Sequence, residues 1–599
     1  MRVRNAESSV FSPSSILHPL SSLVAALPRC GILALSLLPC LAAPAPLPVL
    51  KRSDVVFMCP APKTVYEAYG ATVLAWGDAP NAKSLEQAAG LKYFGSVGMV
   101  TEFARYFERF PDTYERGLCR NLKGQPFKVP WLTDLQHKGV PFWWCCTRQP
   151  LFRQYISERV VQTVKGGAYG VHIDDPLGTA GALFVEGGCF CGQCISEFRD
   201  YLKRLPAEEL TLMGVPDAGA FDYADTLRQW LAEKPGRKVT EHPLWNRWRA
   251  WQLRDAAAFL SELRTLAART AGKPVPMCAN ASLMWGPHLI EYQALDFFSA
   301  EVGYHASEKA LSDEPLAACR IAEAVRRPLA ATAGGGDWAF IKENNLPGLV
   351  QSWAALGYAA GNCLMAPNLQ WCYTRQKGTH WYQGPQQKFA PLYRFVRQNA
   401  SLFDDYETFP DIIVAYAQRT FERDRGKFAG LCHQLAAANL SFRLALGGDD
   451  IVEHALSAGD FSGPAPVLVL EPEAFQPADR ALLAALPPAR RLETVESALA
   501  KVTPAARATS AGELRVLPRV KPSSAVIHLV NWNYSAARDT VEPAKEVRLN
   551  LNLRVLGVPG AKRARFFAPE RETVPIEVRD GALTIPEVGL WTVIEVRAD

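Results

Sequence analysis

The sequence predicts an α/β protein: a (β/α)8 barrel, followed by a small α/β domain and a C-terminal β-sandwich. From about residue 54 to 400, short apolar runs alternate with longer amphipathic stretches, a pattern that is typical of repeated βα units. There are eight such apolar runs, the number that a closed TIM barrel needs. No GxGxxG motif follows the first run, so a Rossmann-type sheet is disfavoured.

The barrel elements follow one another in chain order. Its strands are predicted at residues 55–59, 93–100, 140–146, 170–174, 275–279, 297–302, 328–333 and 362–366. Helical periodicity lies between them, most clearly at 151–165, 195–204, 245–270 and 315–326. The barrel domain is therefore assigned to residues 51–405.

Two smaller regions follow the barrel. Buried parallel strands are predicted at 411–416, 442–446 and 467–470, with helices at 428–439 and 477–486. They predict a small α/β, glutamine-amidotransferase-like domain over residues 409–505. Strand-like runs at 525–532, 546–553, 564–567, 574–578 and 590–596 are separated by Pro, Gly and Asp turns. They predict a β-sandwich over 515–599.

Composition narrows the classes of partner. Of the 599 residues, 48% are hydrophobic and 21% are charged, and the net charge is only +5 without a long basic run. Nucleic acid is therefore excluded as the expected partner. The fifteen Trp residues fit a protein that stacks rings against sugars, although core packing explains many of them equally well.

The N-terminal residues 1–45 resemble a signal peptide. Arg2, Arg4 and Arg29 precede an apolar run at 31–43 that ends in small residues. The run is too short and too interrupted by Pro to anchor the protein in a bilayer. We expect a periplasmic or extracellular protein that has no contact with the membrane after signal removal.

Two predicted strands end in acidic residues. Along residues 170–174, Val171 and Ile173 suit the helix-facing side, so His172 and Asp174 share the inward face. Asp174 then lies at the C-terminal end of the strand, where barrel enzymes carry out chemistry, and Asp175 begins the loop. The alternative is that Asp-Asp-Pro simply caps a turn.

The sixth predicted strand offers a partner for Asp174. Its apolar run carries one acid near its end, Glu301, on the same side of the strand as Ser299. A charged residue seldom ends such a run unless it is paired or used. Glycoside hydrolysis needs at least two carboxyl groups in one cavity, so Asp174 and Glu301 are the catalytic candidates. Asp175 is the alternative to Asp174. The alternative is a Glu301 satisfied by a neighbouring Arg.

Other polar and aromatic residues fall near the ends of predicted strands and are candidates for binding a sugar. Glu102 and Asp337 could orient a hydroxyl group or cap a helix. His172 fits a hydrogen-bonding wall residue better than a base, and His305 could also cap a helix. The predicted substrate-binding residues are Glu102, His172, Asn280, Trp285, Tyr304, His305, Asp337 and Trp371.

A cysteine cluster follows the fourth strand. Cys189, Cys191 and Cys194 have the spacing of metal ligands and need a fourth donor for tetrahedral zinc. Cys145 or Cys146 is spatially plausible, with Cys119 as another candidate; we assign the site to Cys189, Cys191, Cys194 and Cys145. Four thiolates would make it structural rather than catalytic. One or two disulfides are the alternative in an exported protein.

The segment from Cys189 to Arg199 resembles the zinc-binding segment of glycoside hydrolase family 42 β-galactosidases, which follows their fourth barrel strand. In that family a barrel, an α/β trimerisation domain and a C-terminal β domain follow one another, as in the order predicted here. The resemblance implies a possible homo-oligomer, a trimer or a dimer.

The resemblance has a clear departure. In family 42, strand four ends in Ile-Asp-Asn-Glu-Tyr-Gly and its Glu is the acid/base, whereas this chain has Pro176 at that position. Strand seven also lacks the Glu that is the family's nucleophile. An Asp on strand four and a Glu on strand six are instead similar to family 66 dextranases and the related α-glycosidase clan, in which the Asp is the nucleophile and the Glu the acid/base.

We therefore predict a secreted glycoside hydrolase that cleaves an oligo- or polysaccharide with an Asp/Glu pair, retaining the anomeric configuration. No cofactor is expected for catalysis, beyond a possible structural zinc. The first alternative is a non-catalytic carbohydrate-binding barrel that has lost the family 42 dyad. A metal-dependent hydrolase using the cysteine cluster is the second, and it would require an open coordination position.

Overall fold

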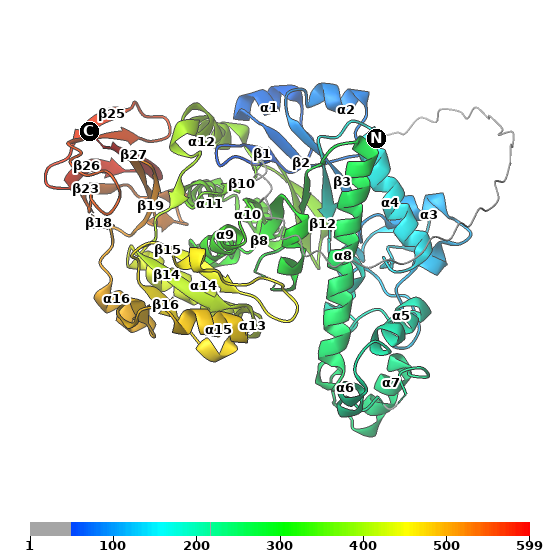
Figure 1. The fold of residues 1–599 in the computed structure, drawn as a ribbon. Coiled ribbons are helices and arrows are strands. Elements are labelled where there is room, and N and C mark those ends of the chain that lie inside the picture. Colours follow the sequence, from blue (N-terminus) through cyan, green and yellow to red (C-terminus); the bar gives the residue numbers. More distant parts are fainter. Residues whose placement is uncertain (1–48, 216, 285, 599) are drawn as a thin grey trace, which may run out of the picture. The chain divides into compact units, whose positions relative to one another are not determined.

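A closed parallel barrel forms the first part of the structure, a computed structural model that describes residues 49–215, 217–284 and 286–598 (Figure 1). The predicted signal peptide lies outside these residues. Eight parallel strands follow the order β1-β2-β3-β6-β7-β8-β9-β10, and a parallel bridge between Phe57 and Ala366 closes the ring. The strands are β1 (Val56–Phe57), β2 (Val73–Gly77), β3 (Lys92–Gly98), β6 (Gly170–Asp174), β7 (Met277–Ala279), β8 (Phe297–Val302), β9 (Leu329–Ala333) and β10 (Cys363–Leu364).

Helices connect the barrel strands. Four of them match the periodic stretches of the sequence: α4 (Pro150–Lys165), α5 (Gly192–Leu202), α8 (Trp245–Ala271) and α9 (Glu314–Ala324). The others are α1 (Lys63–Tyr69), α2 (Ala82–Gln87), α3 (Phe103–Arg109), α6 (Ala207–Leu212), α7 (Tyr223–Glu233), α10 (Gly335–Asn344), α11 (Pro347–Ala359) and α12 (Gln386–Gln398). No helix among the described residues is both long and apolar enough to cross a bilayer.

The strand predicted at 140–146 is wrong. Only Val140–Pro141 forms a strand there (β5), and it pairs antiparallel with β4 (Gln136–His137) outside the barrel, while Trp143 and Cys145 make isolated bridges. Pro141 cannot donate to a ladder, and Trp144, Cys145 and Cys146 lie buried in the loop that follows it. The second barrel strand is instead β2, so the segments at 170 and 297 keep their fourth and sixth places.

A second parallel sheet follows the barrel. Its order is β15-β14-β16-β17, with β14 (Ile412–Ala417) between β15 (Phe442–Gly447) and β16 (Val467–Val469), and β17 (Arg491–Leu492) at one edge. The helices of this region are α13 (Gln418–Arg423), α14 (Arg425–Ala437), α15 (Pro477–Ala484) and α16 (Val495–Lys501). The strands β14, β15 and β16 and the helices α14 and α15 lie where the sequence predicts them, whereas β17, α13 and α16 were not predicted.

The C-terminal region is antiparallel. A sheet of order β13-β19-β20-β27-β24-β25 and a smaller sheet of order β18-β23-β26 share one apolar cluster, which includes Ile527 and Ile594 from the first and Val547 and Ile585 from the second. The strands are β13 (Glu407–Thr408), β18 (Ala506–Thr509), β19 (Leu514–Lys521), β20 (Ser524–Asn531), β23 (Ala544–Leu551), β24 (Arg563–Phe567), β25 (Val574–Glu577), β26 (Ala582–Val588) and β27 (Trp591–Arg597). The division of the chain into three domains stays a prediction.

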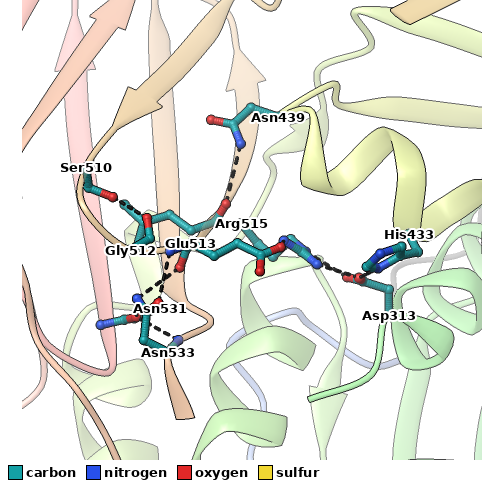
Figure 2. Close-up of polar contacts among 10 residues, drawn as sticks. Asp313, His433, Asn439, Ser510, Gly512, Glu513, Arg515, Asn531 and Asn533 are labelled. Atoms are coloured by element: carbon teal, nitrogen blue, oxygen red, sulfur yellow. Dashed lines mark hydrogen bonds and ion pairs between the residues drawn. The ribbon is translucent and has the colours of Figure 1, made fainter. Parts of the chain in front are cut away.

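Polar contacts around the buried Asp313 carboxylate join the three regions (Figure 2). Arg515 of β19 donates from Nε and Nη2 to the carboxylate of Asp313, which precedes α9, at 3.0 and 2.7 Å. His433 of α14 lies 2.8 Å from the same carboxylate. Arg515 is completely buried and its guanidinium also lies over the Trp532 ring. One carboxylate of the barrel therefore holds both regions that follow it.

Candidate active site

The acids at the ends of β6 and β8 lie on neighbouring parts of the barrel's C-terminal rim. Val171 and Ile173 of β6 are completely buried, whereas Asp174, Asp175 and, on β8, Glu301 are half-buried. Asp175 has φ +49°, a left-handed conformation that Asp tolerates better than most side chains. The chain thus turns sharply after Asp174 and leaves both carboxyl groups at the end of the strand.

Three donors hold the Asp174 carboxylate. The Asn280 amide donates to Oδ1 at 3.2 Å, the Asp175 backbone N–H donates to the same oxygen at 3.1 Å, and the Thr101 hydroxyl donates to Oδ2 at 3.3 Å. Hydrogen bonds to a carboxylate favour its ionised form. Asp174 is therefore the acid of this group that is best equipped to remain an anion.

Asn280 also connects the two acidic strands. Its Oδ1 accepts the backbone N–H of Glu301 at 3.2 Å, while its Nδ2 donates to Asp174. Because Asn280 directly follows β7, which lies between β6 and β8, one side chain fixes the spacing of the two acids. The sequence placed Asn280 among the sugar-binding residues; in the structure it positions both catalytic candidates.

The acids influence one another electrostatically. Burial, and after it the charges of Asp174 and Asp337, raise the pKa of Glu301 to about 8. Burial, together with Asp174 and Glu301, holds the pKa of Asp175 well above its usual range. Burial also raises the pKa of Asp174, against the opposing hydrogen bonds from Asn280 and Thr101. Of the three acids, only Asp174 has hydrogen bonds that oppose the rise in its pKa.

A polar and aromatic layer lies beneath the acids inside the barrel. His172 and Ser299 precede Asp174 and Glu301 by two residues, so each occupies the inward position below its acid. Trp76 of β2 spans both: its indole N–H donates to the Ser299 hydroxyl, and its ring stacks on His172 at 4.7 Å. The Ser96 hydroxyl lies 3.0 Å from His172 Nδ1.

Burial lowers the pKa of His172 to about 3, so this ring is neutral and does not serve as a proton donor at neutral pH. Trp76 is half-buried and was missed by the sequence analysis. The five-residue apolar run of β2, Val73 to Gly77, was the signal that could have found it.

Two residues predicted to bind substrate have structural partners instead. The Glu102 carboxylate accepts the Tyr155 hydroxyl at 2.7 Å and pairs with Arg159 at 3.2 Å. The Tyr304 ring is only 2% exposed and packs against Trp353 at 4.5 Å. Because these contacts occupy both side chains, we remove Glu102 and Tyr304 from the proposed sugar-binding group.

Asp337 and His305 flank the loop that follows Glu301. The Asp337 carboxylate accepts the backbone N–H groups of Tyr304 and Ala306, each at 2.8 Å, and so holds this loop against α10. His305 has φ +54°, and its Nε2 lies 2.6 Å from the Glu314 carboxylate, an interaction that raises its pKa against the effect of burial. Asp337 is thus a positioning residue for the loop.

The two Trp residues predicted to bind sugar are Trp285 and Trp371. Trp371 lies half-buried on β11 (Leu369–Thr374), in a hairpin that follows β10 on the same rim as the acids. Trp285 lies outside the described residues.

Four cysteines lie together beside this rim, and one of them differs from the prediction. The Sγ atoms of Cys146, Cys189, Cys191 and Cys194 all lie within 4.8 Å of one another, and all four residues are buried. Cys146 replaces the predicted Cys145, whose thiol points to the Trp143 carbonyl at 3.7 Å. Neighbouring residues of an extended loop point in opposite directions, so only one of the two can face the cluster.

The donor set fits a structural metal. Cys146 Sγ lies 3.6 Å from that of Cys194 and 3.9 Å from that of Cys191. Tetrahedral zinc with thiolate ligands separates its sulfurs by about 3.8 Å. All cysteines among the described residues are free thiols, so the disulfide alternative finds no pair there. Four thiolates would close the coordination sphere, which argues against a catalytic metal.

The comparisons with known proteins agree with the barrel. No protein-family model matches the chain. Two curated relatives, both named alpha-agarase, are 22% identical over 441 residues (Thalassotalea agarivorans) and 21% identical over 452 residues (Alteromonas agarilytica). The matches cover 67% and 66% of this chain but only 29% and 30% of the relatives, so the chain spans less than a third of their length.

Solved structures give the same fold over a larger share of the chain. The β-galactosidase of Bacillus circulans sp. alkalophilus has a TM-score of 0.59 at 11% identity and covers 91% of this chain and 99% of its own. The family 42 β-galactosidase Gan42B has a TM-score of 0.57 at 9% identity and covers 91% and 98%. At these identities the likeness concerns the fold, which is that of a TIM barrel.

Proposed function

We propose that this chain is a secreted glycoside hydrolase that cleaves an α-glycosidic bond of an agar-type polysaccharide. The observation that carries the proposal is the group of three carboxyls, Asp174, Asp175 and Glu301, at the C-terminal end of a TIM barrel. The alpha-agarase relatives supply the substrate class and the linkage. Such a polymer is too large to enter a cell, so a periplasmic or extracellular site of action fits it.

In the proposed reaction, Glu301 is the acid/base and Asp174 the nucleophile. The carboxylic acid of Glu301 gives its proton to the glycosidic oxygen as a carboxylate oxygen of Asp174 attacks the anomeric carbon, and the leaving sugar departs as an alcohol. The Glu301 carboxylate then takes a proton from water, whose oxygen attacks the same carbon and releases Asp174. Two displacements at one carbon retain its configuration.

The environments of the acids support this division of roles. Glu301 has the pKa near 8 that a general acid needs, whereas Asp174 has three donors that stabilise an anion. Asp175 is the reserve nucleophile. Asp174 and Glu301 also occupy the strands that carry the nucleophile and acid/base in family 66 dextranases, which the sequence pattern resembles.

Other parts of the site would support this chemistry. Zinc held by Cys146, Cys189, Cys191 and Cys194 would brace the long loop that follows Asp175, without a place in the reaction. Asn280, His305, Asp337 and Trp371 remain the proposed sugar-contacting or positioning residues, with His172 in the supporting layer below.

The proposal is tested by replacing each acid and restoring the reaction with azide. Glu301→Ala should lose about 100- to 10,000-fold in kcat on agarose but less on an aryl glycoside with a good leaving group, which needs no acid. Azide should restore the Glu301→Ala enzyme and yield a glycosyl azide of retained configuration. With Asp174→Ala, azide should yield the inverted product.

Substantial turnover of agarose by either variant would remove that residue from the mechanism. Product anomers followed by NMR during hydrolysis test retention directly, and an inverted first product contradicts it.

The second candidate is a carbohydrate-binding barrel without catalysis. It is favoured by Pro176 and by the end of β9 at Ala333, the two positions at which family 42 enzymes carry their catalytic Glu residues. Binding of agarose without release of any reducing sugar, under conditions that leave the protein folded, would favour this candidate over the enzyme.

A further inference from the structure

An aromatic face covers one side of the hairpin that follows the eighth barrel strand. In this hairpin, β11 pairs antiparallel with β12 (Gly378–Gln383), and Trp371 lies directly opposite Trp381. Tyr373 is two residues further along β11, so all three rings belong to the same side. We call Trp371, Tyr373 and Trp381 the aromatic face.

The opposite side of the hairpin is the more deeply buried one. Gln370, Cys372 and Tyr382 are buried, and the Tyr382 ring stacks on Trp338 of α10 at 5.4 Å. The aromatic face is more open: Trp371 and Tyr373 are half-buried, and Trp381 is 46% exposed. A two-stranded ribbon normally turns its polar side outward, so this arrangement is the reverse of the ordinary one.

The rings of the aromatic face are held in fixed positions. Trp371 and Tyr373 lie parallel, with centroids 5.8 Å apart and an interplanar angle of 14°. The Tyr373 hydroxyl donates to the Pro130 carbonyl at 3.0 Å. A side chain on Gly335 would place its Cβ 2.6 Å from the Trp371 ring, so that glycine lets the ring lie directly on the chain. Rings fixed before binding lose little entropy when a ligand stacks on them.

The aromatic face is continuous with the candidate active site. Gly335 lies in the first turn of α10, two residues before Asp337. Asp337 holds the loop that begins beside Glu301 through the N–H groups of Tyr304 and Ala306. At the open end of the hairpin, Gln383 donates to Asn368 at 2.9 Å, just after β10. The hairpin therefore belongs to the same rim as the acids.

We propose that the aromatic face binds sugar units of the polysaccharide away from the bond that is cleaved, and so makes the enzyme prefer long chains to short glycosides. This inference rests on the proposed function. A pyranose ring has one face of C–H groups and a rim of hydroxyls, which suits the parallel rings of Trp371 and Tyr373 with the exposed Gln383 on the same side of the hairpin. The two Trp and one Tyr supply such rings without a charged side chain among them.

The test compares Trp381→Ala with Tyr169→Ala on agarose and on an aryl glycoside. Tyr169 is also 46% exposed but directly precedes β6, at the opposite end of the barrel. Trp381→Ala should lower kcat/KM on agarose about tenfold, mainly through KM, and leave the aryl glycoside rate unchanged. Tyr169→Ala should behave like the unaltered protein on both substrates.

A second measurement separates this inference from the proposed function. In native gels that contain soluble polysaccharide derived from agarose, the unaltered protein should migrate more slowly than in gels without it. Trp381→Ala should migrate equally in both. If the unaltered protein cleaves no glycoside but is retarded in a way that Trp381→Ala abolishes, the proposed function is wrong and the aromatic face is supported. If Trp381→Ala retains both the retardation and the agarose kcat/KM, the aromatic face has no such role.

Discussion

Glu301 shows how burial and neighbouring charges change the pKa of one carboxyl group at the end of an apolar strand. Its burial and the neighbouring Asp174 and Asp337 raise its pKa to about 8, so it holds a proton at neutral pH. The sequence predicted this residue because a lone acid ended an apolar run. The neighbours that set its pKa come from β6 and α10, which no local pattern connects to β8.

This pKa predicts the alkaline limit of activity. The reaction needs protonated Glu301, so the rate should fall as the pH rises through about 8 and the proton is lost. Initial rates on an aryl glycoside with a poor leaving group, measured from pH 5 to 10, should show this limb. Glu301→Gln should remove it together with most of the activity; a limb that stays at the same pH in a variant with residual turnover would assign it to another group.

The same pKa predicts how stability changes with pH. The folded protein holds the Glu301 proton up to about pH 8, whereas the unfolded chain releases it near its ordinary value of 4.5. The unfolding free energy should therefore fall, through this residue, as the pH rises from about 4.5 to 8. Glu301→Gln should lose that decline, so its stability relative to the unaltered protein should increase over this range. If the unfolding free energies of the two proteins, measured by urea denaturation, changed with pH in the same way, the raised pKa of Glu301 would be contradicted.

Cys146 and Cys145 provide a matched pair at the metal cluster. Both residues are completely buried and adjacent, but only Cys146 directs its thiol to the other three cysteines. Cys146→Ser should lower the zinc content of the purified protein and its melting temperature, since structural zinc contributes folding energy. Cys145→Ser should keep the zinc. Equal zinc content in the two variants would show that Cys146 is not a ligand.

At the scale of elements, the sequence was informative where a strand or helix is long and regular. The helix α8 and the strands β6 and β8 lie within a residue or two of their predicted bounds. The short β2 was missed, and the loop around Trp143 and Trp144 was taken for a strand because both segments are brief apolar runs. Only the pairing with β1 and β3 distinguishes β2, and pairing is a property of distant segments.

The missed strand carries a testable residue. Trp76 lies under both acidic strands through Ser299 and His172, so Trp76→Phe should disturb the floor of the site and lower kcat/KM about tenfold. Trp248→Phe in α8 also loses one indole hydrogen bond, to the Gly187 carbonyl, and serves as the control. It should lose stability while keeping kcat. Equal kinetic effects of the two variants would mean that Trp76 acts only through general stability.

Site residues were harder to predict than elements because their roles also depend on contacts with distant segments. Glu102 and Tyr304 follow strands on the correct rim, and the sequence therefore placed them with the substrate. Their side chains are taken by Arg159 and Trp353, which come from helices α4 and α11 far along the chain. Position after a strand indicates which residues can reach the rim, but partners from distant helices decide which of them remain available.

At the scale of the whole molecule, stability depends on charges that cross between regions. Arg515→Ala would leave the Asp313 carboxylate buried with only His433 beside it, a change that costs about 3–5 kcal/mol in comparable buried pairs. The first unfolding transition in urea should move to a lower concentration. Arg579→Ala, which removes the exposed pair with Glu577, should leave that concentration almost unchanged. Similar shifts for both would contradict the importance of the buried network.

The two residues of this ion pair, Asp313 and Arg515, are synthesised at very different times. Asp313 and Arg515 are 202 residues apart, so a ribosome releases the carboxylate long before the guanidinium that neutralises it. Until then the Asp313 carboxylate at the start of α9 lacks the guanidinium that binds both of its oxygens. The ion pair that links the barrel to β19 can therefore form only after most of the chain has been made.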